Sequence, residues 1–163
     1  MTLLLSLTDL LTLPVVVVLL PLLAAASLGS LPRRQWGQWG NLATATIGLA
    51  LACWLAWTGA EPGGVLLATP GAINLILLGS VTGLAAAWFS RTNAPAGDLR
   101  LYHAVFQILL GTTNLALLSD SAMLSWVALE AASLAMVLAA LLPRSAVANR
   151  AAWRMLLLAG TAV

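Results

Sequence analysis

The sequence contains no lysine and very little charge of either sign. Charged residues make up 7% of the 163 residues and apolar residues 61%. Soluble domains carry about 25% charged residues, so this chain cannot cover a water-facing surface, and a soluble enzyme is excluded. The seven cations are all arginines, too few for the dense basic face of a nucleic-acid-binding protein. We therefore predict an integral membrane protein that binds the lipid bilayer and no nucleic acid.

Residues that carry metal, redox or hydrolytic chemistry are also scarce. The single cysteine, Cys53, lies inside an apolar run and has no second cysteine with which to form a disulfide or share a metal ion. The sequence has no HExxH zinc motif, no phosphate-binding glycine loop and no Ser-His-Asp arrangement. We therefore predict no catalytic residue, no metal site and no cofactor in this chain.

Apolar segments long enough to cross a membrane fill most of the sequence. A helix needs about 20 apolar residues to cross about 30 Å of hydrocarbon. Turn-forming or charged clusters such as Glu61-Pro62-Gly63-Gly64 separate the segments. We predict an all-α, polytopic bundle that forms a single membrane domain, with about six transmembrane helices near residues 10–31, 41–59, 71–90, 100–118, 122–142 and 150–163.

The arginines predict the orientation of this bundle in the membrane. All of them fall on one side of the predicted helices, at Arg33, Arg34, Arg91, Arg100, Arg144, Arg150 and Arg154. The opposite side carries Asp9, Glu61 and Asp120 and no cation. Because arginine-rich loops stay in the cytoplasm, we predict a multi-pass protein of the cytoplasmic membrane with its N-terminus outside.

The last predicted helix ends without a flanking charge or an aromatic anchor. From Arg150 to Val163 it has about 14 residues, which is barely enough to cross a bilayer. We expect the chain to be either the N-terminal part of a longer protein or a split subunit that another chain completes.

Glu130 is the most informative polar residue because it lies near the middle of a predicted membrane helix. At about 1.5 Å per residue, it is about 12 Å from one end of helix 122–142 and about 18 Å from the other. An ionised carboxyl group there is costly unless it faces protein or water. Two interpretations are open, a proton relay or a permanently protonated group that hydrogen-bonds a neighbouring helix. We favour the relay, because ionisable groups inside membranes are functional by default.

Helix 100–118 carries a stripe of polar and small residues. His103, Gln107, Gly111 and Asn114 follow one another at helical spacing and therefore share one face. We expect Gln107 and Asn114 to hold water beside Glu130 as supporting polar groups, since amides do not titrate. His103 is predicted either to exchange protons with the cytoplasmic side or to be an interfacial residue bonded to a headgroup or carbonyl.

Small residues and prolines in the other helices predict packing features. Gly79-x-x-x-Gly83 and Gly48-x-x-x-Ala52 are steps that let helices approach closely. Pro14 and Pro21 are expected to kink the first helix, with no link to chemistry.

From Leu84 onward the sequence resembles a known family. Residues 118–134 (LSDSAMLSWVALEAASL) and 151–160 (AAWRMLLLAG) carry the similarity. They resemble the antiporter-like membrane subunits shared by respiratory complex I, Mrp-type sodium/proton antiporters and energy-converting hydrogenases, most closely component F of hydrogenase 4. The resemblance places Glu130 on the buried glutamate of the family's fifth helix, and implies other membrane subunits and peripheral redox subunits as partners.

Two departures from the family limit what the resemblance implies. The family usually has lysine where this chain has Arg154, and a guanidinium group does not deprotonate in proteins. Arg154 is therefore predicted to tune Glu130, to bind an anion or to serve as a cytoplasmic anchor. The family's central channel lysine and broken helices lie beyond residue 163.

We predict a non-catalytic membrane subunit of a multisubunit redox complex, of the complex I or hydrogenase type, that takes part in proton translocation coupled to electron transfer. Two alternatives stay open. One is a membrane subunit of a cation/proton antiporter or an inorganic-carbon uptake system, and the other is a structural membrane subunit without transport.

Overall fold

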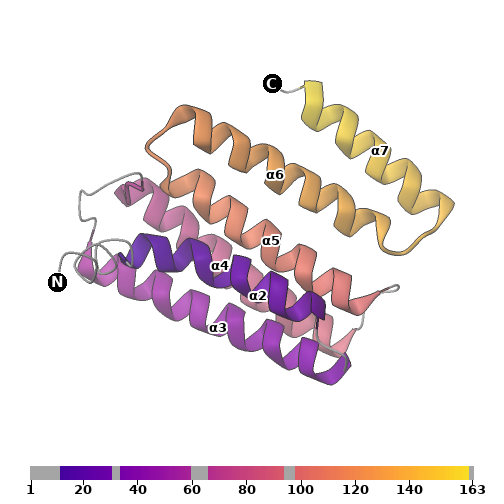
Figure 1. Ribbon diagram of the computed structural model, residues 1–163, viewed down its shortest axis with the longest axis horizontal. Helices are drawn as coiled ribbons and strands as arrows, with labels where there is room; N and C mark the ends of the chain where they lie inside the picture. Colours follow the sequence, from indigo (N-terminus) through magenta and orange to yellow (C-terminus); the bar gives the residue numbers. More distant parts are fainter. Residues whose placement is uncertain (1–11, 31–33, 60–65, 94–97, 162–163) are drawn as a thin grey trace.

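The computed structural model describes residues 12–30, 34–59, 66–93 and 98–161, and this part of the chain is helical with no β-strand. The helices are α2 (Leu13–Ser30), α3 (Arg34–Thr58), α4 (Pro70–Thr92), α5 (Leu99–Leu118), α6 (Ala122–Leu141) and α7 (Ala146–Thr161) (Figure 1). Five of them, α2 to α6, are long and apolar enough to cross a membrane. The predicted all-α membrane bundle is therefore confirmed, but with five such helices in the described residues: α7, predicted as a sixth transmembrane helix, has 16 residues and is not among them.

Two helices begin earlier than the hydropathy predicts. α3 begins at Arg34 rather than at residue 41. Its first two turns are less apolar than the rest of the helix and contain Trp36 and Trp39. Indole side chains are well accommodated at a membrane interface, so a helix can extend beyond its apolar part there. α7 begins at Ala146 rather than at residue 150, where the Ser145 hydroxyl accepts a hydrogen bond from the Ala148 N–H at 3.0 Å.

Polar residues directly before the first helical residue cap the starts of α4, α5 and α6. Thr69 caps α4 by accepting from the Ala72 N–H, and Pro70 follows at the first helical position. Asp98 caps α5 by accepting from the Arg100 N–H at 3.0 Å. Ser121 caps α6. Each cap satisfies backbone N–H groups that have no partner inside the helix.

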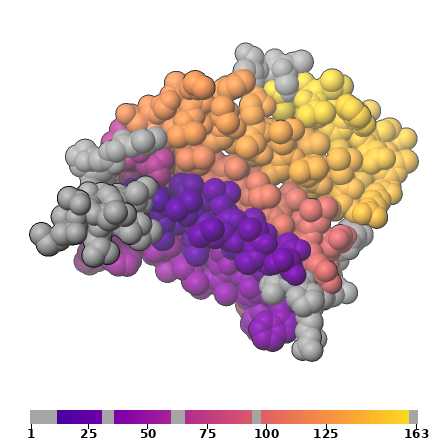
Figure 2. All heavy atoms as spheres, viewed as in Figure 1, coloured from indigo at the N-terminus to yellow at the C-terminus, as the bar shows by residue number. Residues whose placement is uncertain are grey.

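Helix α5 lies in the middle of the bundle. It packs against α2, α3 and α4 on one side and against α6 on another, while α7 packs mainly against α6. Figures 1 and 2 show the same division, with α6 and α7 forming one flank of the molecule and α2 and α3 the other. One side of α5 therefore contacts α2, α3 and α4, and another side contacts α6.

Two clusters of apolar side chains hold α2, α3, α4 and α5 together. The larger one lies toward the end of the bundle where α2 begins, and consists of Val17, Val18, Ala52, Leu55, Ala68, Ile73, Ile76 and Leu118. At this end the Leu67 N–H donates to the Leu118 carbonyl at 2.6 Å, which ties the start of α4 to the end of α5. The smaller cluster contains Leu42, Ala45 and Ala87, with Leu84 and Phe106 packed against it.

The arginines of the described residues gather at one end of the bundle. The ends of α2, α4 and α6 and the starts of α3, α5 and α7 lie at this end (Figure 1). The guanidinium group of Arg91 lies 3.8 Å from the ring centroid of Trp39 and 5.7 Å from that of Trp88. This cation–π contact joins the start of α3 to the end of α4, and it places arginine and tryptophan together as at a membrane interface.

Large apolar side chains cover the outside of the bundle. Trp57 is 90% exposed, and Leu23, Phe89 and Leu158 are also mostly exposed. So much apolar surface is not found on soluble monomers. Lipid or neighbouring protein therefore surrounds these helices.

Candidate functional site

The polar stripe of α5 faces α2 and α3. His103 and Gln107 are fully buried, and Asn114 is half-buried. The side chains of Gln107 and Asn114 form hydrogen bonds with α3 and α2, and a Cβ atom on Gly111 would meet Leu22 and Pro21 of α2. The predicted common face is therefore present, and it lies in the interior of the bundle.

Gln107 makes the central contact of this face. Its Nε2 donates to Oδ1 of Asn41 on α3 at 2.7 Å, and it lies 3.4 Å from the Asn41 carbonyl oxygen. Gln107 is 0% and Asn41 1% exposed. An amide pair inside a membrane protein links two helices because neither group finds another partner in lipid. This hydrogen bond connects α5 to α3 across the interior.

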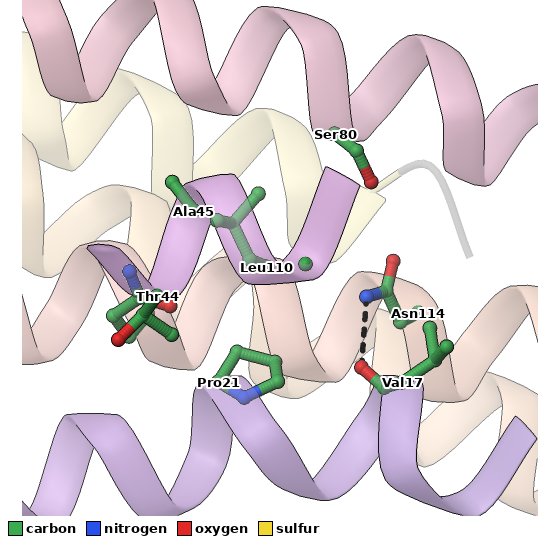
Figure 3. A pocket seen from close by; sticks show the side chains of 9 residues that line it. Val17, Pro21, Thr44, Ala45, Ser80, Leu110 and Asn114 are labelled. Atoms are coloured by element: carbon green, nitrogen blue, oxygen red, sulfur yellow. Dashed lines mark hydrogen bonds between the residues drawn. The ribbon is translucent and has the colours of Figure 1, made fainter. Parts of the chain in front are cut away.

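Asn114 supplies a hydrogen-bond donor that α2 lacks because of Pro21. Proline has no backbone N–H, so Pro21 cannot donate to the carbonyl of Val17 four residues earlier. The Asn114 Nδ2 donates to that carbonyl at 3.2 Å instead (Figure 3). A side chain on a neighbouring helix thus satisfies the freed backbone group, as membrane helices with internal proline require.

Glycine at 111 lets α2 and α5 approach closely at the same level. A Cβ atom there would lie 2.6 Å from Cδ2 and 2.7 Å from Cγ of Leu22, and 3.3 Å from Cγ of Pro21. The contact between these helices therefore depends on the missing side chain, and it brings Asn114 within reach of Val17.

His103 lies one turn before Gln107 and is 1% exposed. Its Cδ2 would be 3.3 Å from a Cβ atom on Gly37 of α3, and its ring meets Tyr102 edge-on at 5.4 Å between centroids. Neither ring nitrogen has a hydrogen-bond partner among the described residues. This burial places the imidazole in the protein interior, and speaks against an interfacial histidine bonded to a lipid headgroup.

Glu130 lies on α6 and is partly exposed. Val137 and Leu141 follow it by seven and eleven residues, so all three share one helical face. Those two residues line a cavity of about 210 Å³ together with Ala152, Trp153 and Leu156 of α7. Glu130 is therefore on the side of α6 that faces α7. Its carboxyl group forms no hydrogen bond or ion pair with any residue in the described ranges.

The structure does not bring Glu130 to the polar stripe of α5. The Ser125 hydroxyl of α6 donates to the carbonyl of Ala116 on α5 at 2.9 Å, so α6 packs on the side where Ala116 lies. Ala116 is nine residues after Gln107, which is about 180° around a helix. The expected water site shared by Glu130, Gln107 and Asn114 is thus replaced by two separate sites on opposite sides of α5.

Arg154 is exposed on α7. Ala152 and Leu156, two residues away on either side, line the cavity with α6. Two residues correspond to about 200° of rotation, so Arg154 lies on the side of α7 away from α6 and from Glu130. Within the described part of the chain, its position fits an anchor or a contact with something outside, rather than a charge that acts directly on Glu130.

Asn41 is the residue that sequence reasoning missed. It was the first residue of a predicted membrane helix, and the longer α3 places it inside the bundle. Its amide type was the available signal, because an amide within a membrane helix needs a partner in the protein. Pro21 carries a similar signal, because proline in a helix leaves the carbonyl four residues earlier without its backbone donor.

Comparisons with known proteins give one curated relative. The chain is 28% identical over 156 residues to a hydrogenase-4 component F homolog of Methylacidiphilum infernorum (isolate V4), a match that covers 90% of this chain and 33% of the relative. The chain thus spans about a third of the length of that protein. No protein-family model matches the chain, and no solved structure matches it significantly.

Proposed function

We propose that this chain belongs to a membrane subunit of a hydrogenase or complex I-type complex, and that Glu130 takes part in proton translocation coupled to electron transfer. The position of Glu130 carries the proposal, because it places a titratable carboxyl group within a membrane-spanning helix. The similarity to a hydrogenase-4 component F homolog supports the type of complex. The proposed location is the cytoplasmic membrane.

Glu130 can act as a relay because it lies on a face that the described residues only partly cover. A carboxyl group that passes protons needs a donor and an acceptor within hydrogen-bond reach, directly or through water. α7 covers part of this face, and the described part of the chain gives Glu130 no fixed ion-pair partner that would hold it in one charge state. Neighbouring membrane subunits or confined water are proposed to complete its surroundings.

His103 is proposed as a second proton-exchanging group, near the arginine-rich end. It is the fifth residue of α5, so it lies about 6 Å inside the helix start. Gln107 and Asn114 support it by holding α5 against α3 and α2. Arg154 cannot pass a proton and is proposed to contact an anionic group of a partner subunit or of a lipid. Electron transfer is assigned to peripheral redox subunits.

The proposal is tested by replacing Glu130 in the complete complex. In sealed vesicles, Glu130→Gln is expected to abolish or strongly reduce proton movement while assembly and electron transfer continue. The amide keeps the shape and hydrogen-bonding capacity of the carboxyl group but cannot titrate. Glu130→Asp is expected to retain part of the activity.

A matched control lies one turn further along α6. The Ser133 hydroxyl donates to the carbonyl of Leu129 in its own helix at 3.0 Å, so Ser133→Ala removes a polar group without removing a titratable one. This variant is expected to pump protons as the wild type does. Normal pumping by Glu130→Gln would reduce Glu130 to a packing residue and refute the proposal.

A further inference from the structure

A small pocket whose mainly apolar wall carries several polar groups lies where α2, α3, α4 and α5 meet. Its walls include Pro21, Thr44, Gly48, Ser80, Gln107 and Asn114. Figure 3 shows the Ser80 hydroxyl and the Asn114 side-chain oxygen directed toward the space between the helices, while the Asn114 nitrogen is bonded to Val17. The pocket is therefore lined on several sides by groups that can form hydrogen bonds.

The size of this pocket suits water. The space open to the centre of a water molecule is about 20 Å³. A cavity needs about 10–15 Å³ by that measure to hold one water, together with two to four polar partners. One or two water molecules fit, and a larger ligand does not.

Buried polar atoms of Gln107, which lines the pocket, and of Asn41 and His103, each about one helical turn from a lining residue, lack partners among the described residues. They are Nδ2 of Asn41, Oε1 of Gln107 and both ring nitrogens of His103. All three residues are at least 99% buried. Leaving a buried polar atom unpaired costs about 1–3 kcal/mol, and native proteins commonly satisfy such atoms with internal water. The cluster offers both donors and acceptors, which is what a water molecule needs.

We propose that this pocket is an internal water-binding site, and that its water joins Asn41, Gln107 and His103 into a hydrated polar column along α5. From His103 to Asn114 the column covers eleven residues, or about 16 Å at 1.5 Å per residue. It begins near the arginine-rich end and reaches to about 6 Å from the opposite end of α5. It lies on the opposite side of α5 from Glu130, so it goes beyond the proposed function and does not depend on it.

The test measures transfer of magnetisation from water to side chains by solid-state NMR, on the full-length protein in phospholipid bilayers. The readouts are the ¹⁵N-labelled side chains of Gln107 and His103, assigned by the loss of their signals in Gln107→Leu and His103→Gln. His103 is the only histidine of the 163 residues. In the wild type, transfer to both groups is expected to be several-fold faster than to the backbone ¹⁵N of the buried residue Ile76.

Two glycine variants separate water in this pocket from water elsewhere. Gly48 lines the pocket, and a Cβ atom added there meets nothing within 4 Å, so Gly48→Val adds apolar volume at the pocket wall without a clash and without removing a polar group. Gly79 has the same free space but lines a different pocket. Gly48→Val is expected to slow the transfer to Gln107 and His103 several-fold, while Gly79→Val leaves it unchanged. Gly48→Ala gives a smaller version of the same test if the valine variant does not assemble.

Slow transfer in the wild type, or equal transfer in the two valine variants, would overturn the proposal. Glu130→Gln is expected to leave the transfer unchanged, because Glu130 faces α7. Loss of proton coupling in that variant with retained water transfer would therefore support both proposals independently. Normal proton coupling in Glu130→Gln would contradict the proposed function only, and slow water transfer in the wild type would contradict the water site only.

Discussion

At the scale of single residues, the absence of a side chain at Gly111 is as important as the polar groups around it. The added Cβ atom would fall 2.7 Å from Cγ of Leu22 and 3.3 Å from the rigid ring of Pro21. A change of the Leu22 rotamer alone does not clear the proline ring. The backbones of α2 and α5 would have to separate, and that would lengthen the bond from Asn114 to Val17.

We predict that Gly111→Ala destabilises the protein by about 1–3 kcal/mol, the usual cost of overpacking a filled interior. Thermal unfolding in detergent or steric trapping in bilayers measures this change. Gly79→Ala is the control, because a Cβ atom at Gly79 meets nothing within 4 Å. Alanine favours a helix over glycine at both positions, so a loss at Gly111 without a loss at Gly79 isolates the packing contribution. Equal stabilities of the two variants would contradict the close approach of α2 and α5.

At the scale of helices, α5 separates two environments. One side carries the bonds to Asn41 and Val17 and the polar pocket. The other side packs against α6, which presents Glu130 away from α5 and toward α7. Hydrogen bonds hold α5 against α2 and α3 on one side, and α6 packs against it on the other. The polar pocket and Glu130 are therefore separated by α5. The pairing of α2 with α5 by Pro21 and Asn114 is the most directly testable part of this arrangement.

We predict that Asn114→Leu costs about 1 kcal/mol, because the Val17 carbonyl loses its donor in an apolar interior. Pro21→Ala restores a backbone N–H four residues after Val17, so it is expected to recover much of that loss in the Asn114→Leu background. In the wild-type background it should have little effect on the Val17 carbonyl. Unfolding free energies of the two single variants and the double variant measure this coupling. Additive effects would show that Asn114 does not act through the carbonyl freed by Pro21.

At the scale of the whole molecule, the described arginines define one end of the bundle. Arg91, Arg100, Arg144 and Arg150 lie in or beside connections at the end where α3, α5 and α7 begin. Asp120 lies in the turn between α5 and α6, at the opposite end. From the positive-inside bias we predict that the arginine-rich end faces the cytoplasm.

We predict that single cysteines at Asn93 and Ser145 react with a membrane-impermeant maleimide only from the cytoplasmic side, and a cysteine at Asp120 only from outside. The background for all three is Cys53→Ser, because Cys53 is exposed. Intact and permeabilised cells labelled in parallel measure the sidedness. Labelling of positions 93 and 120 from the same side would contradict both the orientation and the antiparallel course of α5.

The sequence by itself determined the class of the protein, its helices and the residues that share a face. Scarce charge and long apolar runs require lipid around the chain, and regular backbone hydrogen bonding in lipid requires helices. The spacing of His103, Gln107 and Asn114 placed them on one side of α5 because helical periodicity is local. The sequence also shows that Glu130 lies within a membrane helix, because the length of the apolar segment around it does not depend on its contacts.

Only the tertiary structure decided which helix each face meets. The sequence suggested that the polar stripe of α5 faces Glu130, yet α2 and α3 cover that stripe, and α6 turns Glu130 toward α7. Helical periodicity gives the direction of a side chain relative to its own axis only. The rotation and neighbours of each helix depend on contacts between distant residues, such as Gly111 with Leu22 and Gln107 with Asn41. Those contacts arise from shape and hydrogen-bond complementarity across the whole bundle, which no local pattern encodes.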